Sequence, residues 1–342
     1  MRTQRQWILH DLLERLWDIN RHFRSTDDVI ASVIDEMERF LEGDVCKVVV
    51  QVQLVNFSSD ENSIALPHGL RIRRMNEEEV SAYHGGDYYS VADYSSKIGI
   101  HEFCLEGEED VSYHFDAAPI EAPERTWSIE ELMDDVVVCL RTFKSGPVAF
   151  DVVRYIPQGF CPLILPSHAK TDRHMLCGTF HLSSEEIPAF GIIAQQMLSN
   201  SDETLMVACS RLADAESRTQ PRDKIIDAVI GLESLLLTLN HERISELGFR
   251  FALNYAMLQD KDNRLAANRF ARDLYALRSK LAHGAVVSKA SVRLGEEDVS
   301  LQEAATRATT CLRQVVKFVL EDGTTSYKTA EFWQRRYFGL AE

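Results

Sequence analysis

The chain has 342 residues, and its hydrophobic content of 45% excludes an intrinsically disordered protein. A chain of this length buries one large core or two ordinary ones, and we expect two domains. The seven cysteines form no CxxC pair and have no regular spacing, which favours reduced thiols in a cytoplasmic protein over a disulfide framework.

The net charge of −16 argues against a nucleic-acid partner only if the acidic residues are spread evenly. They are not, because residues 222–342 carry 18 Lys and Arg against 16 Asp and Glu, whereas residues 1–221 carry 19 against 37. Acidic patches at 76–79 and 106–110 belong to the N-terminal part. Such patches are typical of solvated surface, and binding or masking of a partner is the alternative.

In chain order, the first predicted elements are helical segments within residues 4–41, where apolar residues have helical spacing. A β-branched run predicts a strand at 46–57. Further strands are predicted at 66–75, 97–105, 147–157 and 175–182, and a helix with a capping-box start at 128–143. The start of the chain has charges where a signal peptide needs an apolar run, and no segment of about 18 apolar residues occurs, so we expect no membrane association.

From Ser184 onward the pattern is almost continuously helical. The predicted helices cover 183–198, 202–218, 222–239, 244–259, 265–283 and 300–322. The predicted fold class is therefore α+β, with an N-terminal mixed α/β domain at 1–185 followed by an all-α helical bundle at 186–342.

One acidic residue interrupts the most apolar of these helices. Glu233 has apolar residues three, four and seven positions before it and three and four positions after it, which predicts a place on the stripe that faces the core. A buried carboxylate needs a cation or a proton, and Arg250 and Arg278 are the cations on neighbouring helices. The pair is either a structural salt bridge or a device that positions a functional arginine.

The end of helix 265–283 combines side chains suited to phosphate chemistry. The sequence LRSKLAHG, 277–284, places His283 in the last turn before Gly284, which stops the helix. Histidine has an ordinary pKa of about 6.5 and both accepts and donates protons near neutral pH. The fixed fork of Arg278 suits a phosphate that gains charge in a transition state. Ser279 lies on the same helix face as His283, where we expect it to orient the imidazole or to contact the substrate. These groups suffice for cleavage of RNA without a metal, by attack of the 2′-OH on the adjacent phosphorus.

The spacing of arginine and histidine alone is weakly informative. Similar spacings occur from Arg5 to His10 and from Arg15 to His22 in one predicted N-terminal helix. Only Arg278 and His283 stand at a helix end before glycine and in a bundle that contains an internal acid.

The C-terminal segments also resemble a known family. DKIIDAVIGLESLLL, ISELGFRFALNYAML and LYALRSKLAHG, in this order, are similar to the ApeA-like branch of the HEPN superfamily, whose closing motif is R-x4-H. The resemblance covers about 187–320, and the N-terminal part is similar more loosely, through LPHGLRIRRMNEEEV and the helix before PVAFDVVRY.

This resemblance implies a metal-independent endoribonuclease without a cofactor. It implies that Arg278 and His283 are catalytic, that Glu233 supports them, and that a symmetric homodimer of the HEPN domain joins two motifs. The implied partner is tRNA, rRNA or mRNA, in antiphage defence or toxin action, with a protein trigger or inhibitor at the N-terminal domain. Many active HEPN nucleases have Asn, Asp or His where Ser279 stands. The alternative is therefore a non-catalytic, dimerising sensor or scaffold whose acidic N-terminal domain binds a protein.

Two other site types have partial support from the sequence. Metal-ligand residues gather at Cys161, His168, His174, Cys177 and His181, but without the paired close spacing of a zinc finger. The aromatic and basic segment 331–340 could stack on nucleic acid, whereas a terminal helix that docks on the bundle is the structural alternative. Serine-hydrolase and phosphate-loop motifs are absent from the sequence.

Overall fold

The structure is a computed structural model, and it divides into two compact units. Unit 1 comprises Met1–Val55, Glu61–Asp134 and Ala149–Asp172, and unit 2 comprises Asn56–Asp60, Asp135–Val148 and Arg173–Glu342. The residues described are 4–20, 26–42, 45–85, 101–112, 128–160, 168–169, 178–199, 202–237, 246–284, 291–322, 327 and 329–340.

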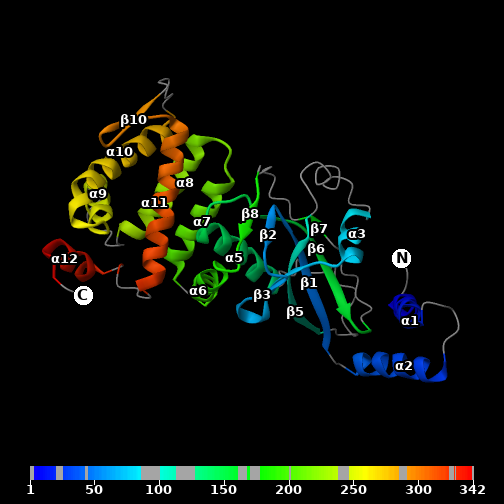
Figure 1. Ribbon diagram of the computed structural model, residues 1–342. Coiled ribbons are helices and arrows are strands. Elements are labelled where there is room, and N and C mark those ends of the chain that lie inside the picture. The colour runs from blue at the N-terminus through cyan, green and yellow to red at the C-terminus, as the bar shows by residue number, and fades with distance from the viewer. Residues whose placement is uncertain are drawn as a thin grey trace. The chain divides into compact units, whose positions relative to one another are not determined.

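Unit 1 is built on an antiparallel sheet with the strand order β3-β4-β5-β1-β6-β7 (Figure 1). The strands are β3 (Ser63–Ala65), β4 (Arg71–Arg74), β5 (Phe103–Ser112), β1 (Val45–Val55), β6 (Ala149–Gln158) and β7 (His168–Ala169). Its helices are α1 (Gln4–Asn20), α2 (Asp27–Leu41), α3 (Glu77–Gly85) and the first half of α5 (Ser128–Phe143). The predicted strand at 147–157 and the predicted helix at 128–143 are confirmed. The predicted strand at 46–57 is confirmed as far as Val55, where β1 ends, because Asn56 has a positive φ and Phe57 begins β2.

The two faces of this sheet differ in chemistry. Along β1, Val48, Val50, Val52 and Leu54 are fully buried on one face, as the alternation of a strand requires. On this apolar face Ile129 of α5 packs closely against Gly107 of β5. The residues between these valines, Gln51 and Gln53, are also buried, but on the opposite face.

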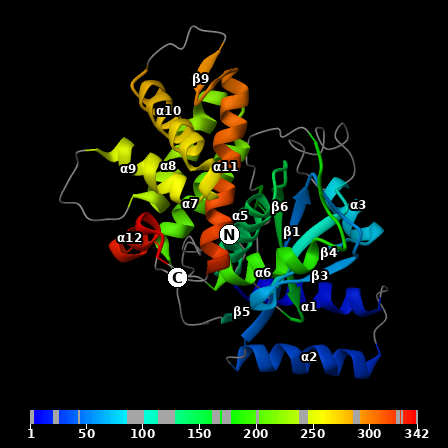
Figure 2. The ribbon, with the colours of Figure 1, turned by 60° about the vertical axis from the view of Figure 1, so that its left-hand side comes forward.

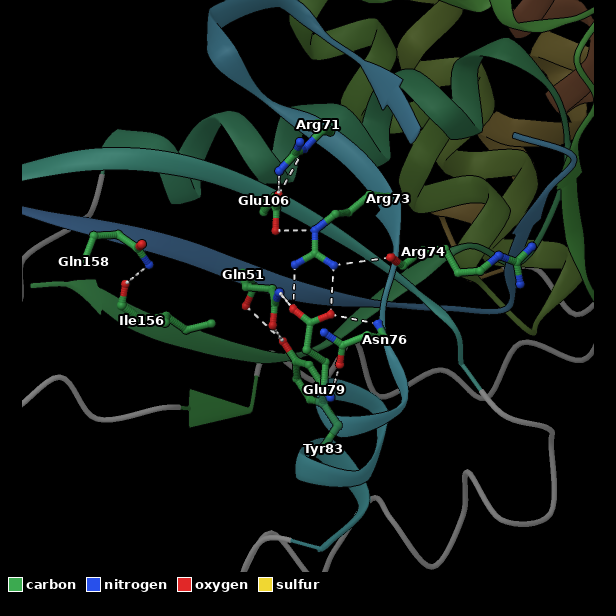
Figure 3. A network of polar contacts seen from close by, with 10 residues as sticks. All are labelled: Gln51, Arg71, Arg73, Arg74, Asn76, Glu79, Tyr83, Glu106, Ile156 and Gln158. Carbon is green, nitrogen blue, oxygen red and sulfur yellow. Dashed lines mark hydrogen bonds and ion pairs between the residues drawn. The ribbon is translucent and has the colours of Figure 1, made fainter. Parts of the chain in front are cut away.

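The opposite face carries a polar row that crosses four strands. Arg71 lies opposite Glu106, Glu106 opposite Gln51, and Gln51 opposite Arg154. Helix α3 lies over this row, as Figure 3 shows, and its Glu79 accepts hydrogen bonds from Arg73 at 2.6 and 2.8 Å and from Gln51 at 3.2 Å. Arg71 and Arg73 both pair with Glu106, and the guanidinium group of Arg154 lies 4.9 Å from the Tyr83 ring centroid. Pairing of this kind is the condition for burying charges in a sheet.

One predicted strand begins later than expected. Residues 67–69 of the predicted strand 66–75 form a 3₁₀ turn, η1 (Pro67–Gly69), and only β4 is extended. Pro67 has no N–H to donate, and His68 and Gly69 both have positive φ, so this segment cannot pair as a strand.

Unit 2 is mainly helical. After the second half of α5, its helices are α6 (Ile187–Leu198), α7 (Glu203–Ser217), α8 (Pro221–Leu236), α9 (Leu247–Met257), α10 (Arg264–Ala282), α11 (Leu301–Asp322) and α12 (Ala330–Phe338). A 3₁₀ turn, η2 (Lys261–Asn263), precedes α10. Its strands form two short pairs, parallel β2 (Phe57–Ser59) with β8 (Phe180–Leu182) and antiparallel β9 (Val292–Leu294) with β10 (Glu297–Val299).

Helix α8 lies at the centre of the packing in unit 2, side by side with α7 and α11 in both views (Figures 1 and 2). Gly231 permits the close approach of α11, because a Cβ there would lie 2.7 Å from a methyl group of Leu312. Asp227 is buried and receives Arg211 at 3.1 Å and Arg218 at 2.9 Å, both from the α7 side. Apolar packing and one paired acid therefore fix α8 in place.

Helix α12 docks through its aromatic residues, as the structural alternative predicted for segment 331–340. Phe332 and Trp333 are buried, and the Tyr337 hydroxyl donates a hydrogen bond to Asn254 of α9. The guanidinium group of Arg336 lies 4.8 Å from the Phe318 ring centroid. Of the aromatic side chains in this helix, Phe338 is the most exposed, at 78%.

The predicted fold class is confirmed at the level of an N-terminal antiparallel sheet and a helical C-terminal region. The sequence predicted one domain boundary, between residues 185 and 186. In the structure, segments 56–60 and 135–148 belong to the same compact unit as the C-terminal helices. Within the described ranges, no helix combines the length and the apolar character that a bilayer crossing requires.

The contact between Glu79 and Arg73 generates a prediction about α3. Hydrogen bonding from Arg73 lowers the pKa of Glu79 from 4.5 to about 2. Its stabilising contribution is therefore fully present above pH 4.5 and is lost as the pH falls towards 2. We expect Glu79→Gln to lower the free energy of unfolding at pH 7 by about 1–3 kcal/mol. Urea unfolding at pH 7 and at about pH 3 measures this, and the difference from wild type should shrink at the lower pH.

Glu78 provides the matched control, since it lies on the same helix and is exposed. Glu78→Gln should leave the urea midpoint unchanged at both pH values. Equal stability of wild type and Glu79→Gln at pH 7 would show that the ion pair does not hold α3 on the sheet.

Candidate functional site

The candidate site begins at the C-terminal end of α10. Leu274, Leu277 and Leu281 are buried and fix one face of the helix against the bundle. Regular α-helix ends at Ala282, and Gly284 follows with φ +80°, a conformation that favours glycine. The predicted helix end between His283 and Gly284 is thus correct to within one residue.

Arg278 of α10 forms an ion pair with Glu233 of α8. Arg278 Nη2 donates to Glu233 Oε2 at 3.0 Å, and the two side chains are 26% and 19% exposed. The expectation that Glu233 pairs with a cation is confirmed, and of the two predicted cations Arg278 makes the contact. Arg250 lies near Tyr337, where burial raises the tyrosine pKa and the arginine charge opposes that shift.

The sequence predicted that Glu233 lies on the core-facing stripe, and the structure places it at the edge of that stripe, 19% exposed. That stripe is formed by Ile225, Val229, Leu232 and Leu236, which are buried. Glu233 lies at its margin, beside the half-buried Ile226 and Ile230. The apolar residues near Glu233 in the sequence include both stripe residues and half-buried residues at its edge, so their spacing predicted a deeper burial of Glu233 than the structure has.

A tyrosine that the sequence analysis did not identify completes this contact. The Tyr275 hydroxyl donates a hydrogen bond to the Glu233 carboxylate. Its ring packs against Phe251 of α9, with centroids 5.1 Å apart, and against Gly248. The available signal was its position three residues before Arg278, which places both side chains on one helix face. Tyr275 therefore approaches Glu233 from the same face of α10 as Arg278 does.

The environment of Glu233 disfavours its charged form. Burial raises the pKa of Glu233, and the Arg278 charge and the Tyr275 hydrogen bond only partly oppose this effect. A carboxylate whose pKa is raised on folding makes the folded state less stable at neutral pH than an unperturbed one would. Overall stability therefore gains nothing from the charge of Glu233.

The guanidinium group of Arg278 has five N–H donors, and one of them donates a hydrogen bond to Glu233. The Nε of Arg278 is buried and has no hydrogen-bond partner among the described residues. An unsatisfied buried donor costs about 1–3 kcal/mol. The Arg278 side chain is 26% exposed, so the donor capacity left for an anion such as phosphate lies in its exposed part.

His283 and Ser279 lie on another side of α10. His283 is exposed and Ser279 half-buried, and the His283 backbone N–H donates to the Ser279 carbonyl at 3.1 Å. Within the described ranges neither side chain has a hydrogen-bond or ion-pair partner, so no contact orients the imidazole through the Ser279 hydroxyl. At 100° per residue, Arg278 and His283 point about 140° apart. The structure therefore joins Arg278 to Glu233 but leaves the imidazole free in solvent.

The N-terminal spacings that resemble Arg278 to His283 have other partners. His10 lies 3.6 Å from Glu14 on α1, and Arg15 donates to Glu36 of α2 at 3.2 Å. His22 lies outside the described residues. Arg15 of α1, like Arg278 of α10, thus pairs with an acid on a neighbouring helix. What distinguishes α10 among the described helices is its end at Gly284 directly after His283.

The predicted zinc alternative falls largely outside the described residues. Cys161, His174 and Cys177 are not described, His168 lies in β7, and the His181 ring lies 3.4 Å from Asp60. The described part of the chain contains no group of three or more His, Cys, Asp and Glu suited to a metal.

The cysteine side chains that the structure describes do not add a nucleophile. Cys104, Cys139, Cys209 and Cys311 are buried and free. Burial raises the pKa of Cys104 to about 12 and that of Cys311 to about 11. These groups are therefore thiols at neutral pH, whereas nucleophilic attack requires a thiolate.

Comparisons with protein-family models, with curated proteins and with solved structures found no match. The candidate site is therefore defined by its own geometry: a half-buried Glu233–Arg278 pair with Tyr275, followed one turn later by the exposed His283.

The raised pKa of Glu233 predicts how its charge affects stability. We expect Glu233→Gln to have a free energy of unfolding at pH 7 equal to or slightly above that of wild type, because the amide removes an unfavourable charge and still accepts hydrogen bonds. Urea unfolding at pH 7 measures this. The effect is opposite to that of Glu79→Gln, in which the lost carboxylate has a lowered pKa. A loss of stability as large as that of Glu79→Gln would show that the pair with Arg278 is structural.

Proposed function

We propose that this protein is a metal-independent endoribonuclease of the HEPN type. The observation that carries the proposal is the incompletely satisfied guanidinium group of Arg278, held by Glu233, on the same helix end that presents His283 to solvent. A half-buried arginine with spare donors suits a phosphate that gains negative charge. The adjacent exposed imidazole suits proton transfer.

In the proposed reaction the RNA supplies its own nucleophile. The ribose 2′-oxygen attacks the neighbouring phosphorus, and histidine accepts the 2′-OH proton. The bond to the 5′-oxygen breaks, and histidine returns a proton to that oxygen. The products are a 2′,3′-cyclic phosphate and a 5′-hydroxyl. Arg278 stabilises the charged phosphate oxygens, Glu233 and Tyr275 hold Arg278, and Ser279 lies on the imidazole side of the helix.

A homodimer suits the geometry of α10. Because Arg278 and His283 point about 140° apart on an ideal helix, a substrate phosphate is reached more easily by groups from two facing copies than by one pair. Two copies also divide the roles of base and acid between two imidazoles. The proposed dimer uses the helical C-terminal region, and its paired cations attract RNA despite the acidic chain.

The proposed setting is cytoplasmic defence or toxin action against tRNA, rRNA or mRNA. The N-terminal region would then act as a sensor, with a protein trigger or inhibitor as its partner. Its acidic balance supports a protein rather than a nucleic acid as that partner, since residues 1–221 carry 37 Asp and Glu against 19 Lys and Arg.

A dimerising sensor or scaffold without catalysis is the second candidate. The absence of any orienting contact to the His283 ring within the described residues favours it, as does a serine at position 279. In this function the Glu233–Arg278 pair would only set the geometry of α8 and α10.

The nuclease proposal predicts that His283→Ala and Arg278→Ala each lower the rate of RNA cleavage by at least about 100-fold without changing the oligomeric state. Purified protein and labelled RNA in EDTA measure the rate, and light scattering measures the mass. Cleavage should persist in EDTA, yield 2′,3′-cyclic phosphate ends and fail at 2′-deoxy positions. In cells, wild type but not His283→Ala should stop growth and fragment tRNA or rRNA.

His10→Ala is the matched control, because His10 follows Arg5 with the same spacing in α1. It should cleave as wild type does. Unchanged cleavage by both His283→Ala and Arg278→Ala would refute the assignment, and no cleavage by wild type under any condition would favour the scaffold.

A further inference from the structure

The start of α8 contacts the turn that carries His283. Arg222, the residue after helix-starting Pro221, donates from Nη2 to the backbone carbonyl of Leu281 at 2.5 Å. Leu281 lies in the last turn of α10, two residues before His283. No sequence pattern pointed to Arg222.

The carbonyl of Leu281 is also a fixed point of the helix end. It accepts the N–H of Gly284 at 3.1 Å, while the His283 N–H donates to Ser279 at 3.1 Å. Two backbone hydrogen bonds therefore fix the chain around His283. The acceptor of one of them, the Leu281 carbonyl, also accepts the hydrogen bond from Arg222 of α8. These bonds define the backbone position of His283, from which the imidazole extends into solvent.

Helix α8 thus holds both residues of the proposed active site from its two ends. In its last turns Glu233 binds Arg278, and in its first turn Arg222 binds the turn of His283. Since Asp227 and the packing at Gly231 fix α8 itself, both contacts start from a rigid element. A rigid support is what a site needs to keep two groups in reactive positions.

A role limited to helix capping accounts poorly for this contact. Gly284 already ends α10, and the Leu281 carbonyl already has the Gly284 N–H as a partner.

We propose that Arg222 is a positioning residue that fixes the helix-end turn and thereby the place from which the His283 side chain projects. This inference rests on the proposed nuclease function. Arg222 acts through the Leu281 carbonyl, so its loss affects the chemical step more than the binding of RNA.

The test compares Arg222→Ala, Arg222→Lys and the control Lys280→Ala in the full-length protein. Lys280 is exposed, lies in the last turn of α10, and has no hydrogen-bond or ion-pair partner among the described residues. Lys280→Ala therefore removes the same charge from the same region without touching the Leu281 contact. Single-turnover cleavage of labelled RNA gives the rate and the RNA concentration at half-maximal rate, and amide hydrogen exchange follows residues 281–284.

We expect Arg222→Ala to lower the maximal rate about 10- to 100-fold, with the half-maximal RNA concentration changed by less than about threefold. Arg222→Lys should restore part of the rate, since an ammonium group also donates to a carbonyl. Exchange at Gly284 should accelerate in Arg222→Ala. Lys280→Ala should keep the wild-type maximal rate and exchange.

The outcomes separate this inference from the proposed function. If His283→Ala is inactive while Arg222→Ala keeps the wild-type rate, the inference is wrong and the nuclease function stands. If His283→Ala cleaves as wild type does, both are wrong. An equal loss of rate in Arg222→Ala and Lys280→Ala would also overturn the inference, because it would assign the effect to charge rather than to position.

Discussion

The candidate site depends on one polar contact between helices, the ion pair between Arg278 of α10 and Glu233 of α8. Apolar packing of Leu274, Leu277 and Leu281 holds α10 against the bundle but does not specify where its polar side chains point. The ion pair supplies that direction, because a carboxylate at the margin of the core accepts a guanidinium donor only in a narrow geometry.

Two acids in this protein show that similar ion pairs serve different ends. Glu79 receives two bonds from Arg73 in a network where each charge is matched, and its pKa falls to about 2. Glu233 receives one bond from Arg278, and burial dominates, so its pKa rises. The first pair stabilises the fold, whereas the second holds an arginine at an energetic cost. A costly pair is common where a protein keeps a charged group for use.

The helices were the most predictable part of the chain from its sequence. Periodic apolar residues and a capping-box start located α5 to the residue, and Pro221 and Gly284 marked the start of α8 and the end of α10. The ends of the strands were harder to predict than those of the helices. The β-branched run of β1 indicates a strand clearly, but the segment before β4 forms a turn with two positive φ angles. Tyr275 and Arg222 were missed, since neither residue type nor spacing distinguishes them from other surface positions of a helix.

The sequence by itself determined the α+β class, the helical C-terminal region, the end of α10 and the candidates Glu233, Arg278, Ser279 and His283. These follow from local rules, because periodicity, capping and glycine conformation act over a few neighbouring residues. Only the tertiary structure decided that Arg278 is the cation bonded to Glu233, that Tyr275 donates to the same carboxylate, and that Arg222 holds the turn of His283. The physical reason is that each of these contacts joins side chains on different faces or different helices, and their distances are set by packing between helices rather than by spacing along one of them.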